Sequence, residues 1–522
     1  MYKRQLFIIG VPIFLISLIM VIPFSNLPTY GGKLVIPSLT IAVLALLVLS
    51  GVSWLMSRRN LKRAYYPIVL VCLGLAGVGI LYAIDPDMFR SMVDIIGRVF
   101  NPSTTQQTVG EATSLLSISG FSQLFWFFTI NIILALVALG LIIYAEIRGR
   151  SFEGTLTFLI VWSLIMLAAM LGQERFAYYF AVNVALLAGY LCFRILIWSS
   201  GYFKEALPEV KKGQELRKTV RGKLSSGYAR VALVTIILFL LVFIPNILVA
   251  NDVAENLAVP NGAWYSSLVW MRENTPDPFE NPDFYYELYE KPPAGEEYDY
   301  PESAYGVMSW WNYGYWITRI ARRIPNASPS GQLNAKEVAE FFTAQDETSA
   351  DEMLDDLGSK YVIIDYKTET FSFPGIAIWA GESESQFTEI YYQKTVSGLL
   401  WPIRYFYPEY YQSMCSRLYS FDGEAVVPHN STLVISYKDT TVLGKHHKEI
   451  TSSQSFATYE EAQEYLESHP VPNYRIVGDS PFVSPVPLEE LDHYKLVHQS
   501  EPEVIEEYEH LFSYVKIFEY LQ

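Results

Sequence analysis

The chain is poor in cysteine and in charge. Only three cysteines, Cys72, Cys192 and Cys415, occur in 522 residues, which excludes a disulfide scaffold and a structural zinc site built from cysteine. Charged residues make up 18% of the chain and hydrophobic residues 51%, whereas soluble domains have about 25% charged residues. Together with the mean hydropathy of +0.20, this balance predicts segments that lie in a membrane.

Acidic residues are scarce in the first half of the chain and abundant in the second. Residues 1–250 contain 21 Lys and Arg and 10 Asp and Glu, a net charge of +11. Residues 251–522 contain 17 basic and 44 acidic residues, a net charge of −27. Nucleic-acid binding needs a basic face, so the acidic half argues against that class. The contrast predicts two domains, a membrane domain at 1–250 and an extracytoplasmic domain at 251–522.

Seven apolar segments in the first half are long enough to cross a bilayer, which takes roughly 20 residues. They lie near residues 6–24, 34–56, 66–84, 122–145, 153–171, 176–199 and 229–250. Lysine and arginine cluster in every second connection, so the positive-inside rule predicts a cytoplasmic N-terminus in a cell membrane. Loops 25–33, 85–121 and 172–175, and everything after residue 250, are then outside. A removed signal peptide is the alternative for the first segment.

The second half has the patterns of a mixed α/β domain. Residues 251–272 indicate an amphipathic lead-in, and residues 273–303, rich in Pro, Glu and Tyr, indicate an extended or poorly ordered acidic stretch. Strands are predicted at Lys360–Asp365, Ser431–Tyr437, Tyr494–His498 and Phe512–Tyr520, and a helix capped by Thr458 and Glu461 at Thr458–Glu467.

The densest aromatic segment of the chain is Trp310-Trp311-Asn312-Tyr313-Gly314. Tryptophan donates a hydrogen bond through its indole N–H, and asparagine both donates and accepts, so the segment could form a pocket for a small hydroxyl group. The alternative is core packing at a turn in which Gly314 takes an unusual backbone conformation.

This segment resembles the WWDYG signature of the catalytic subunit of oligosaccharyltransferase. The longer stretch from Tyr305 through Ala327 is most similar to archaeal and related bacterial members. Thr108-Val109-Gly110-Glu111 matches the family's T-x-x-E element in an outer loop, and Arg175 matches its arginine at the outer end of a late span. The resemblance implies the C-terminal seven spans of a GT-C-type glycosyltransferase, a polytopic helical membrane domain, followed by an outward-facing mixed α/β domain.

The implied activity is the transfer of an oligosaccharide from a dolichyl or undecaprenyl (di)phosphate to the side-chain amide of Asn in Asn-x-Ser/Thr acceptor proteins. By resemblance Glu111 is the catalytic carboxylate and a ligand of Mg²⁺ or Mn²⁺, Thr108 belongs to its loop motif, and Arg175 binds the lipid phosphate. Trp310, Trp311 and Asn312 bind the acceptor hydroxyl, with Tyr313 and Gly314 in the same motif. A further family element beside this pocket is matched weakly by Ile376, for which strand-end packing is the alternative.

The sequence departs from the family in two respects. Asn312 stands where the family has aspartate, so its hydrogen bond to the hydroxyl would be neutral and weaker. The family's metal-binding aspartates belong to earlier outer loops, and Asp85-Pro86-Asp87 is interpreted as a helix end, not a substitute. We therefore expect a chain truncated at its N-terminus. The alternatives are a non-catalytic sequon-binding half-protein that needs a separate N-terminal partner, and another polyprenol-dependent membrane glycosyltransferase.

Two acceptor sequons lie on the predicted outer side. Asn326-Ala-Ser328 is close to the aromatic motif and is expected to be packed, whereas Asn430-Ser-Thr432 is expected in a loop that could itself carry a glycan.

Overall fold

The computed structural model describes most of the chain. The described residues are 2–22, 32–59, 65–100, 102–116, 118–149, 154–205, 214–256, 259–279, 281, 284, 298–330, 332–395, 398–442, 445–469, 473–505 and 510–521. Most of the predicted acidic stretch at 273–303 lies outside them. The chain divides into two compact units, residues 1–99 with 288–299 and residues 100–287 with 300–522. The boundary predicted at residue 250 stays a prediction.

The first unit is built from apolar helices. They are α1 (Tyr2–Val21), α2 (Gly32–Arg58) and α3 (Tyr65–Ile84), followed by α4 (Pro86–Phe100). Helices α1 and α2 pack against each other. Asp85 and Asp87 stand at the junction of α3 and α4, as expected of residues that end one helix and begin the next.

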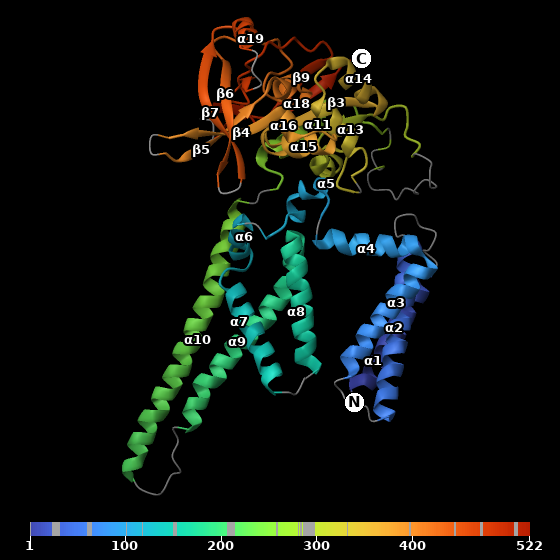
Figure 1. Ribbon diagram of the computed structural model, residues 1–522, viewed down its shortest axis with the longest axis vertical. Coiled ribbons are helices and arrows are strands. Elements are labelled where there is room, and N and C mark those ends of the chain that lie inside the picture. The colour runs from blue at the N-terminus through green and yellow to red at the C-terminus, as the bar shows by residue number, and fades with distance from the viewer. Residues whose placement is uncertain are drawn as a thin grey trace. The chain divides into compact units, whose positions relative to one another are not determined.

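The second unit begins with further apolar helices (Figure 1). They are α6 (Ile118–Phe128), α7 (Asn131–Gly149), α8 (Gly154–Gly172), α9 (Ala177–Glu205) and α10 (Gln214–Asn256). The segment predicted at 122–145 as one span is interrupted at Thr129, whose φ of 51° is incompatible with a continuous helix. Helices α8 and α9 are joined by a buried hydrogen bond of 2.9 Å from Asn183 Nδ2 to Ser163 Oγ.

The seven predicted spans are helical in their described residues, except that the fourth is broken by a turn at Thr129 and Ile130. Among the residues that the structure describes, five helices contain a segment long and apolar enough to cross a membrane: Leu39–Met56, Asn131–Arg148, Thr155–Gly172, Glu174–Ser200 and Ala229–Glu255. The described apolar parts of the first and third are shorter, Val11–Val21 and Cys72–Ile84. The chain is therefore a multi-pass membrane protein.

The connection at 85–121, predicted from the sequence as a loop, is largely helical. It contains α4, then α5 (Thr104–Gln107), and then a 3-10 turn, η3 (Gly110–Ala112). Helix α5 begins with a capping box between Ser103 and Gln106, which satisfies backbone N–H groups at its start. The interpretation of this segment as a long loop missed the helical spacing of Val93, Ile96 and Phe100 in α4.

The α/β part contains a five-stranded mixed sheet in the order β2-β1-β3-β12-β9. Its strands are β1 (Gly306–Met308), β2 (Ile324–Pro325), β3 (Ser359–Asp365), β9 (Tyr494–Gln499) and β12 (Val515–Tyr520). β1 runs parallel to β2 and β3, whereas β12 is antiparallel to β3 and β9. Strand β3 is central and almost wholly buried, which explains its uninterrupted apolar sequence.

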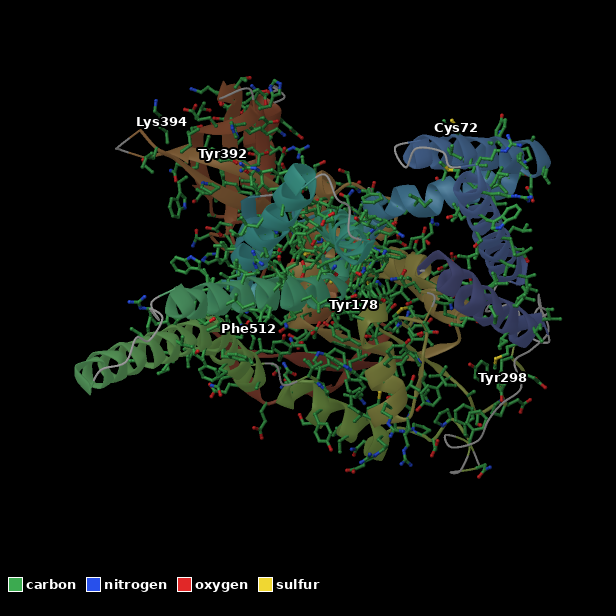
Figure 2. All side chains as sticks on the ribbon, turned by 90° about the horizontal axis from the view of Figure 1, so that it is seen from below. Cys72, Tyr178, Tyr298, Tyr392, Lys394 and Phe512 are labelled. Carbon is green, nitrogen blue, oxygen red and sulfur yellow. The ribbon has the colours of Figure 1, made fainter. Side chains whose placement is uncertain are left out.

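A second five-stranded sheet has the order β5-β4-β7-β6-β8. Its strands are β4 (Thr388–Lys394), β5 (Leu400–Phe406), β6 (Thr432–Val442), β7 (Lys445–Phe456) and β8 (Tyr474–Val477), and a separate ribbon pairs β10 (Pro502–Ile505) with β11 (His510–Ser513). Strands β4 and β5 form a hairpin that carries Tyr392 and Lys394 (Figure 2).

Short helices pack on the two sheets, and the last of them, Tyr459–Ser468, lies against β6, β7 and β8 of the second sheet. They are α11 (Gly262–Asn274), α12 (Gly314–Trp316), α13 (Ala335–Thr343), α14 (Glu347–Asp356), α15 (Phe373–Trp379), α16 (Glu384–Phe387), α17 (Pro408–Gln412), α18 (Met414–Tyr419) and α19 (Tyr459–Ser468). Residues of α11, α13, α15 and α18 join the buried side chains of β1, β3 and β12 in the largest hydrophobic core. That core holds the loops at the ends of β1 and β3 in place.

Most of the predicted α/β elements are confirmed, with one correction. The strands expected at Lys360–Asp365, Ser431–Tyr437 and Tyr494–His498 match β3, β6 and β9, and the capped helix matches α19. The strand predicted at Phe512–Tyr520 is two strands, because β11 ends at Ser513 and β12 begins at Val515. Tyr514, which separates them, accepts a backbone hydrogen bond from Tyr366.

Candidate functional site

Two segments meet at the carboxyl ends of neighbouring parallel strands. β1 ends at Met308 and β3 ends at Asp365. Because the carboxyl ends of parallel strands lie at the same edge of a sheet, ligand sites commonly form there. The turn η6 (Trp311–Tyr313) and helix α12 follow β1, and a π-helical turn, η8 (Thr368–Ser372), and helix α15 follow β3.

A pocket of about 350 Å³ is formed by these two segments and a third. The third segment comes from the connection before α6. The lining residues are Thr108, Val109 and Gly110 from that connection, Trp310, Trp311 and Asn312 after β1, and Phe371, Ser372, Pro374, Gly375 and Ile378 after β3. The T-x-x-E element and the Trp-Trp-Asn motif, about 200 residues apart in sequence, therefore share one pocket.

A buried hydrogen-bond donor lies in the lining of this pocket. The indole Nε1 of Trp311 is buried and finds no acceptor among the residues that the structure describes. An unpaired buried N–H costs about 1–3 kcal/mol, so a ligand oxygen that accepts from it would recover that cost. Asn312, next in sequence, is exposed and can offer a carbonyl oxygen to the same ligand.

The third segment is held in place by Trp379 at the end of α15. The indole Nε1 of Trp379 donates to Thr108 Oγ1 over 2.9 Å, while Thr108 Oγ1 donates to the carbonyl of Thr105 over 2.7 Å. A Cβ atom built on Gly375 would lie 3.2 Å from Thr108 Cβ, so glycine permits this close approach. The Trp379 ring also contacts the rings of Trp310 and Trp311, with centroids 6.2 and 6.3 Å apart.

Tyr313 lies behind the pocket and not in its lining. Its hydroxyl donates to Asp365 Oδ2 over 2.9 Å, and its ring stacks on Trp264 with centroids 4.2 Å apart. Asp365 is fully buried and also accepts from Trp264 Nε1 and from the backbone and hydroxyl of Thr368. Burial raises the pKa of Asp365, although these donors counteract the effect. Tyr313 thus ties η6 to the end of β3.

Gly314 has an ordinary helical backbone, with φ −53° and ψ −42°. The unusual conformation considered for it is therefore wrong. Gly314 instead permits a close approach of two segments, since a Cβ atom at this position would lie 2.6 Å from the carbonyl oxygen of Ala327.

The segment around Ala327 contains the first sequon, Asn326-Ala-Ser328. As predicted, Asn326 is packed: its side-chain amide donates to Leu357 O and accepts from Ser359 Oγ.

Ile376 does not line the pocket. Its side chain is fully buried in the hydrophobic core, which agrees with the packing alternative. Ile378, two residues later, and Phe371 line the pocket instead. Sequence reasoning missed both, and also Trp379. The only available signal was their place shortly after the apolar strand that ends at Asp365.

Glu111, Arg175 and Glu174 lie at neighbouring turns. Glu111 is exposed on η3, directly after the pocket-lining Gly110, and Arg175 is exposed on a 3-10 turn, η4 (Glu174–Phe176), before α9. The backbone N–H of Glu174 donates to Thr113 O over 2.9 Å, which joins the two turns. Glu111 interacts electrostatically with Glu174, and Tyr178 on α9 (Figure 2) interacts with both Glu111 and Arg175.

The side chains around Glu111 do not complete a metal site by themselves. Within the described ranges, the one group of three or more metal-ligating side chains within 4.8 Å of one another is Glu347, Asp351 and His493, and Glu111 is not part of it. Glu111 and Glu174 therefore offer two carboxylates, and the described side chains add no third ligand to them.

The family described as the AglB core domain matches residues 261–369, which include α11, the aromatic motif and β3. Dolichyl-phosphooligosaccharide-protein glycotransferase 3 of Archaeoglobus fulgidus is 28% identical over 471 residues, covering 81% of this chain and 52% of that protein. The dolichyl-monophosphooligosaccharide–protein glycotransferase AglB of Haloferax volcanii is 29% identical, covering 69% of this chain and 36% of that protein.

The chain is a relative of the archaeal oligosaccharyltransferase catalytic subunits. The resemblance inferred from the motifs is thereby confirmed. The chain spans about half the length, or less, of these curated relatives.

Solved structures share the fold. The oligosaccharyltransferase of Archaeoglobus fulgidus in the apo form superposes with a TM-score of 0.66 at 22% identity, covering 99% of this chain and 62% of that one. An oligosaccharyltransferase AglB of Archaeoglobus fulgidus in complex with an inhibitory peptide and a dolichol-phosphate gives 0.64 at 22% identity with the same coverage. A complex of the first enzyme with Zn and sulfate gives 0.58 at 20% identity, covering 99% and 60%. The predicted architecture, a helical membrane region followed by a mixed α/β domain, is confirmed.

Proposed function

We propose that this chain is the part of an oligosaccharyltransferase that binds the acceptor and carries the Glu111 carboxylate. The reaction moves an oligosaccharide from a dolichyl or undecaprenyl phosphate carrier to the side-chain amide of Asn in an Asn-x-Ser/Thr acceptor protein. The bond between the anomeric carbon and the phosphate oxygen breaks and the lipid phosphate leaves, while a bond from that carbon to the amide nitrogen forms and the nitrogen releases one of its two protons. The observation that carries the proposal is the unpaired Trp311 N–H in a pocket that also contains Asn312 and the Thr108–Gly110 segment.

The pocket chemistry suits the hydroxyl of the acceptor Ser or Thr. A hydroxyl oxygen can accept from Trp311 Nε1 while its hydrogen is donated to the Asn312 carbonyl oxygen. A site that hydrogen-bonds a hydroxyl rejects an analogue without it, because the groups of the site are then left unpaired. Trp310, buried to 4% exposure, supports the Trp311 ring and would not itself need to donate.

Glu111 and Arg175 have separate proposed roles. A carboxamide nitrogen is a weak nucleophile, and a carboxylate that accepts its N–H hydrogens holds it near the sugar. Glu111 is exposed next to the pocket, which supports this role. Arg175 is exposed at the start of α9 and would attract the phosphate of the donor lipid. This arrangement requires the α/β domain to face outward and the N-terminus to be cytoplasmic, as the basic loops predict.

Glu111 is the one residue that we propose as a ligand of a divalent cation, Mg²⁺ or Mn²⁺. Such an ion would stabilise negative charge on the leaving phosphate. Because the described side chains supply too few ligands around Glu111, we derive no step through the ion. The same shortage favours a second candidate function, a sequon-binding half-protein that transfers sugar only with a separate partner.

Peptide binding by the full chain in detergent tests the proposal. Fluorescence anisotropy should give roughly tenfold tighter binding for an Asn-x-Thr peptide than for its Asn-x-Val analogue, since valine lacks the hydroxyl. Trp311→Phe, which keeps an aromatic ring and removes the N–H, should abolish most of this difference. Trp401→Phe is the matched control, because Trp401 lies on β5 and is 65% exposed.

Equal affinities for the two peptides in the unmodified chain would contradict the acceptor pocket and would favour another polyprenol-dependent glycosyltransferase. If the difference is present, added lipid-linked glycan with Mn²⁺ separates the two remaining functions. Glycopeptide formation identifies the enzyme, and binding without transfer identifies the half-protein.

A further inference from the structure

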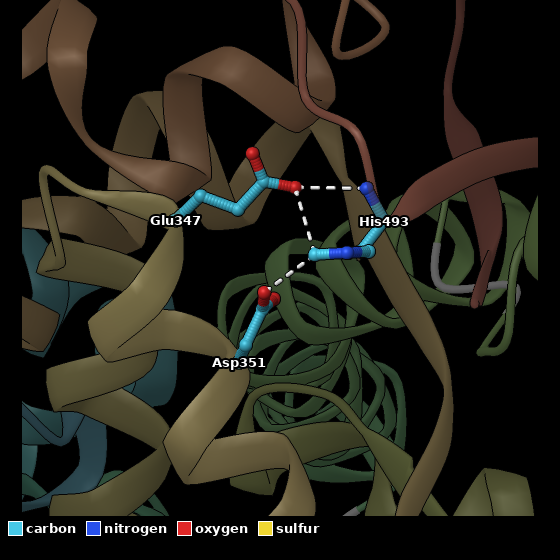
Figure 3. A group of neighbouring side chains, drawn as sticks. All are labelled: Glu347, Asp351 and His493. Atoms are coloured by element: carbon cyan, nitrogen blue, oxygen red, sulfur yellow. Dashed lines mark hydrogen bonds and ion pairs between the residues drawn. The ribbon is translucent and has the colours of Figure 1, made fainter. Parts of the chain in front are cut away.

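A second group of metal-ligating side chains lies in the α/β domain at a place that the proposed reaction does not use. Glu347 and Asp351 are four residues apart on α14, and His493 immediately precedes β9 (Figure 3). Residues four apart lie on the same face of a helix, so both carboxylates point to His493. None of the three lines the acceptor pocket.

We propose that Glu347, Asp351 and His493 bind a divalent transition-metal ion of the Zn²⁺ type. The three side chains offer one imidazole nitrogen and two carboxylate oxygens, a set that Zn²⁺ uses in proteins. All three donor atoms lie within 4.8 Å of one another. Mixed nitrogen and oxygen ligands favour Zn²⁺ over Mg²⁺ and Ca²⁺, which prefer oxygen ligands alone.

The distances between donor atoms are close to those of a tetrahedral site. Bonds of about 2.0–2.1 Å to a tetrahedral Zn²⁺ place two donor atoms about 3.4 Å apart. His493 Nδ1 lies 3.5 Å from Glu347 Oε1 and 2.7 Å from Asp351 Oδ2. The second pair must separate by less than 1 Å, and the His493 side chain, 48% exposed, has room to turn. The two carboxylate oxygens lie within 4.8 Å of each other.

Hydrogen bonds from neighbouring groups orient the carboxylates for metal binding. The backbone N–H of His493 donates to Glu347 Oε1 over 2.8 Å, and the hydroxyl of Tyr494 donates to Asp351 Oδ1 over 2.8 Å. These contacts leave Asp351 Oδ2 directed at the imidazole. Bonds from neighbouring groups that orient metal ligands are a regular feature of metal sites.

Two further observations point to a cation. A hollow of about 560 Å³ opens beside two of the three side chains and is lined by Asp351, Asp355, His493, Tyr520 and Leu521, but not by Glu347. It leaves room for a water or other ligand at a fourth position. In the part of the chain that the structure describes, no lysine or arginine forms an ion pair with Glu347 or Asp351. Two carboxylates therefore face one imidazole, that of His493, and Arg417 acts on Glu347 only as a more distant charge.

This geometry supports a structural role for the ion, in which it links a helix to the edge of the sheet. Helix α14 packs on the sheet beside β3, and β9 is the edge strand next to β12. An ion bound between them would join a helix to the sheet edge, and binding to the folded state alone raises stability.

The metal content of the full chain in detergent tests this proposal. After equilibration with Zn²⁺ and gel filtration, elemental analysis should find one more equivalent of zinc in the unmodified chain than in Asp351→Asn or His493→Gln. Glu352→Gln is the matched control on the same helix, because Glu352 is exposed and outside the group. All chains should also be compared in a Glu111→Gln background, which removes zinc held at the other carboxylate. Zn²⁺ should raise the melting temperature of the unmodified chain and of Glu352→Gln only.

A spectroscopic measurement keeps the proposal testable if a variant does not fold. Co²⁺ bound to the unmodified chain should give the visible absorption of a four-coordinate site, and X-ray absorption of the Zn²⁺ form should contain imidazole scattering. Equal zinc content and equal melting shifts in the unmodified chain and both ligand variants would overturn the proposal. So would a bound ion without an imidazole ligand.

Discussion

The indole N–H of Trp379 donates to the hydroxyl of Thr108 across 271 residues of sequence, over 2.9 Å. This bond connects the segment that contains Glu111 to the segment that follows β3. Both segments line the acceptor pocket, so the position of Glu111 relative to Trp311 depends on it. A residue that no motif indicates therefore helps to hold the two motifs together.

Trp379→Phe removes the indole N–H but keeps an aromatic ring at this position, and it should make the Thr108–Glu111 segment more mobile. One hydrogen bond contributes about 1 kcal/mol, so amide exchange in residues 104–116 should become roughly fivefold faster. Hydrogen-exchange mass spectrometry measures this. Trp401→Phe, at an exposed tryptophan, should leave that exchange unchanged, and unchanged exchange in Trp379→Phe would mean that packing alone holds the segment.

Asn312→Asp should tighten the binding of Asn-x-Thr peptides. A carboxylate forms a charge-assisted hydrogen bond with the acceptor hydroxyl, which is about twice as strong as the neutral bond of asparagine, so roughly fivefold tighter binding is expected. The measurement is peptide affinity by fluorescence anisotropy, with the Asn-x-Val peptide as the control that should not gain. Unchanged or weaker affinity for Asn-x-Thr would count against Asn312 as the hydroxyl acceptor.

Gly314→Ala should destabilise the α/β domain. The added methyl group would lie 2.6 Å from Ala327 O and 2.7 Å from Ser328 Cα, and backbone there cannot move without disturbing β2. Overpacking of this kind costs about 1–3 kcal/mol. Gly262→Ala is the control, since no atom lies within 4 Å of the added Cβ. The melting temperature should drop clearly for Gly314→Ala and not for Gly262→Ala. Equal melting temperatures would show that the Ala327–Ser328 backbone can move aside at little cost.

The sequence predicted those features that a local pattern determines. The short apolar run within Lys360–Asp365 is typical of a strand that is buried on both faces, and it forms β3. The aromatic motif was found through its resemblance to a family, and the structure brings Trp310, Trp311 and Asn312 to the pocket with Thr108.

Contacts between distant segments could not be predicted in this way. The partnership of Trp379 with Thr108 and the space left by Gly375 depend on how α15 meets the segment before α6. Ile376 and Ile378 are both apolar residues of one short helix, and only the direction of that helix puts the first in the core and the second in the pocket. Likewise, nothing in the alternation of Phe512–Tyr520 marks Tyr514 as a break between two strands.

Glu369 should make the stability of the α/β domain fall as the pH rises. The residue is fully buried on η8, two positions before the pocket-lining Phe371, and accepts from Ser420 Oγ over 2.6 Å. Burial raises the pKa of Glu369 from 4.5 to about 8, although Ser420, Lys516, Ser416 and Tyr410 around it act in the opposite direction. Between these two values the folded chain keeps a proton that the unfolded chain releases.

Because the folded state binds more protons in this interval, its stabilisation by neutral Glu369 is complete below pH 4.5 and is lost as the pH rises towards 8, by at most about 1.4 kcal/mol per pH unit. Glu369→Gln replaces the acid by a neutral group of the same shape, so it should flatten the melting temperature over this range and leave the variant more stable than the unmodified chain above pH 8. Glu384→Gln, an exposed glutamate, is the control. A melting profile for Glu369→Gln that still parallels the unmodified chain from pH 5 to 8.5 would mean that Glu369 is already ionised in its buried position.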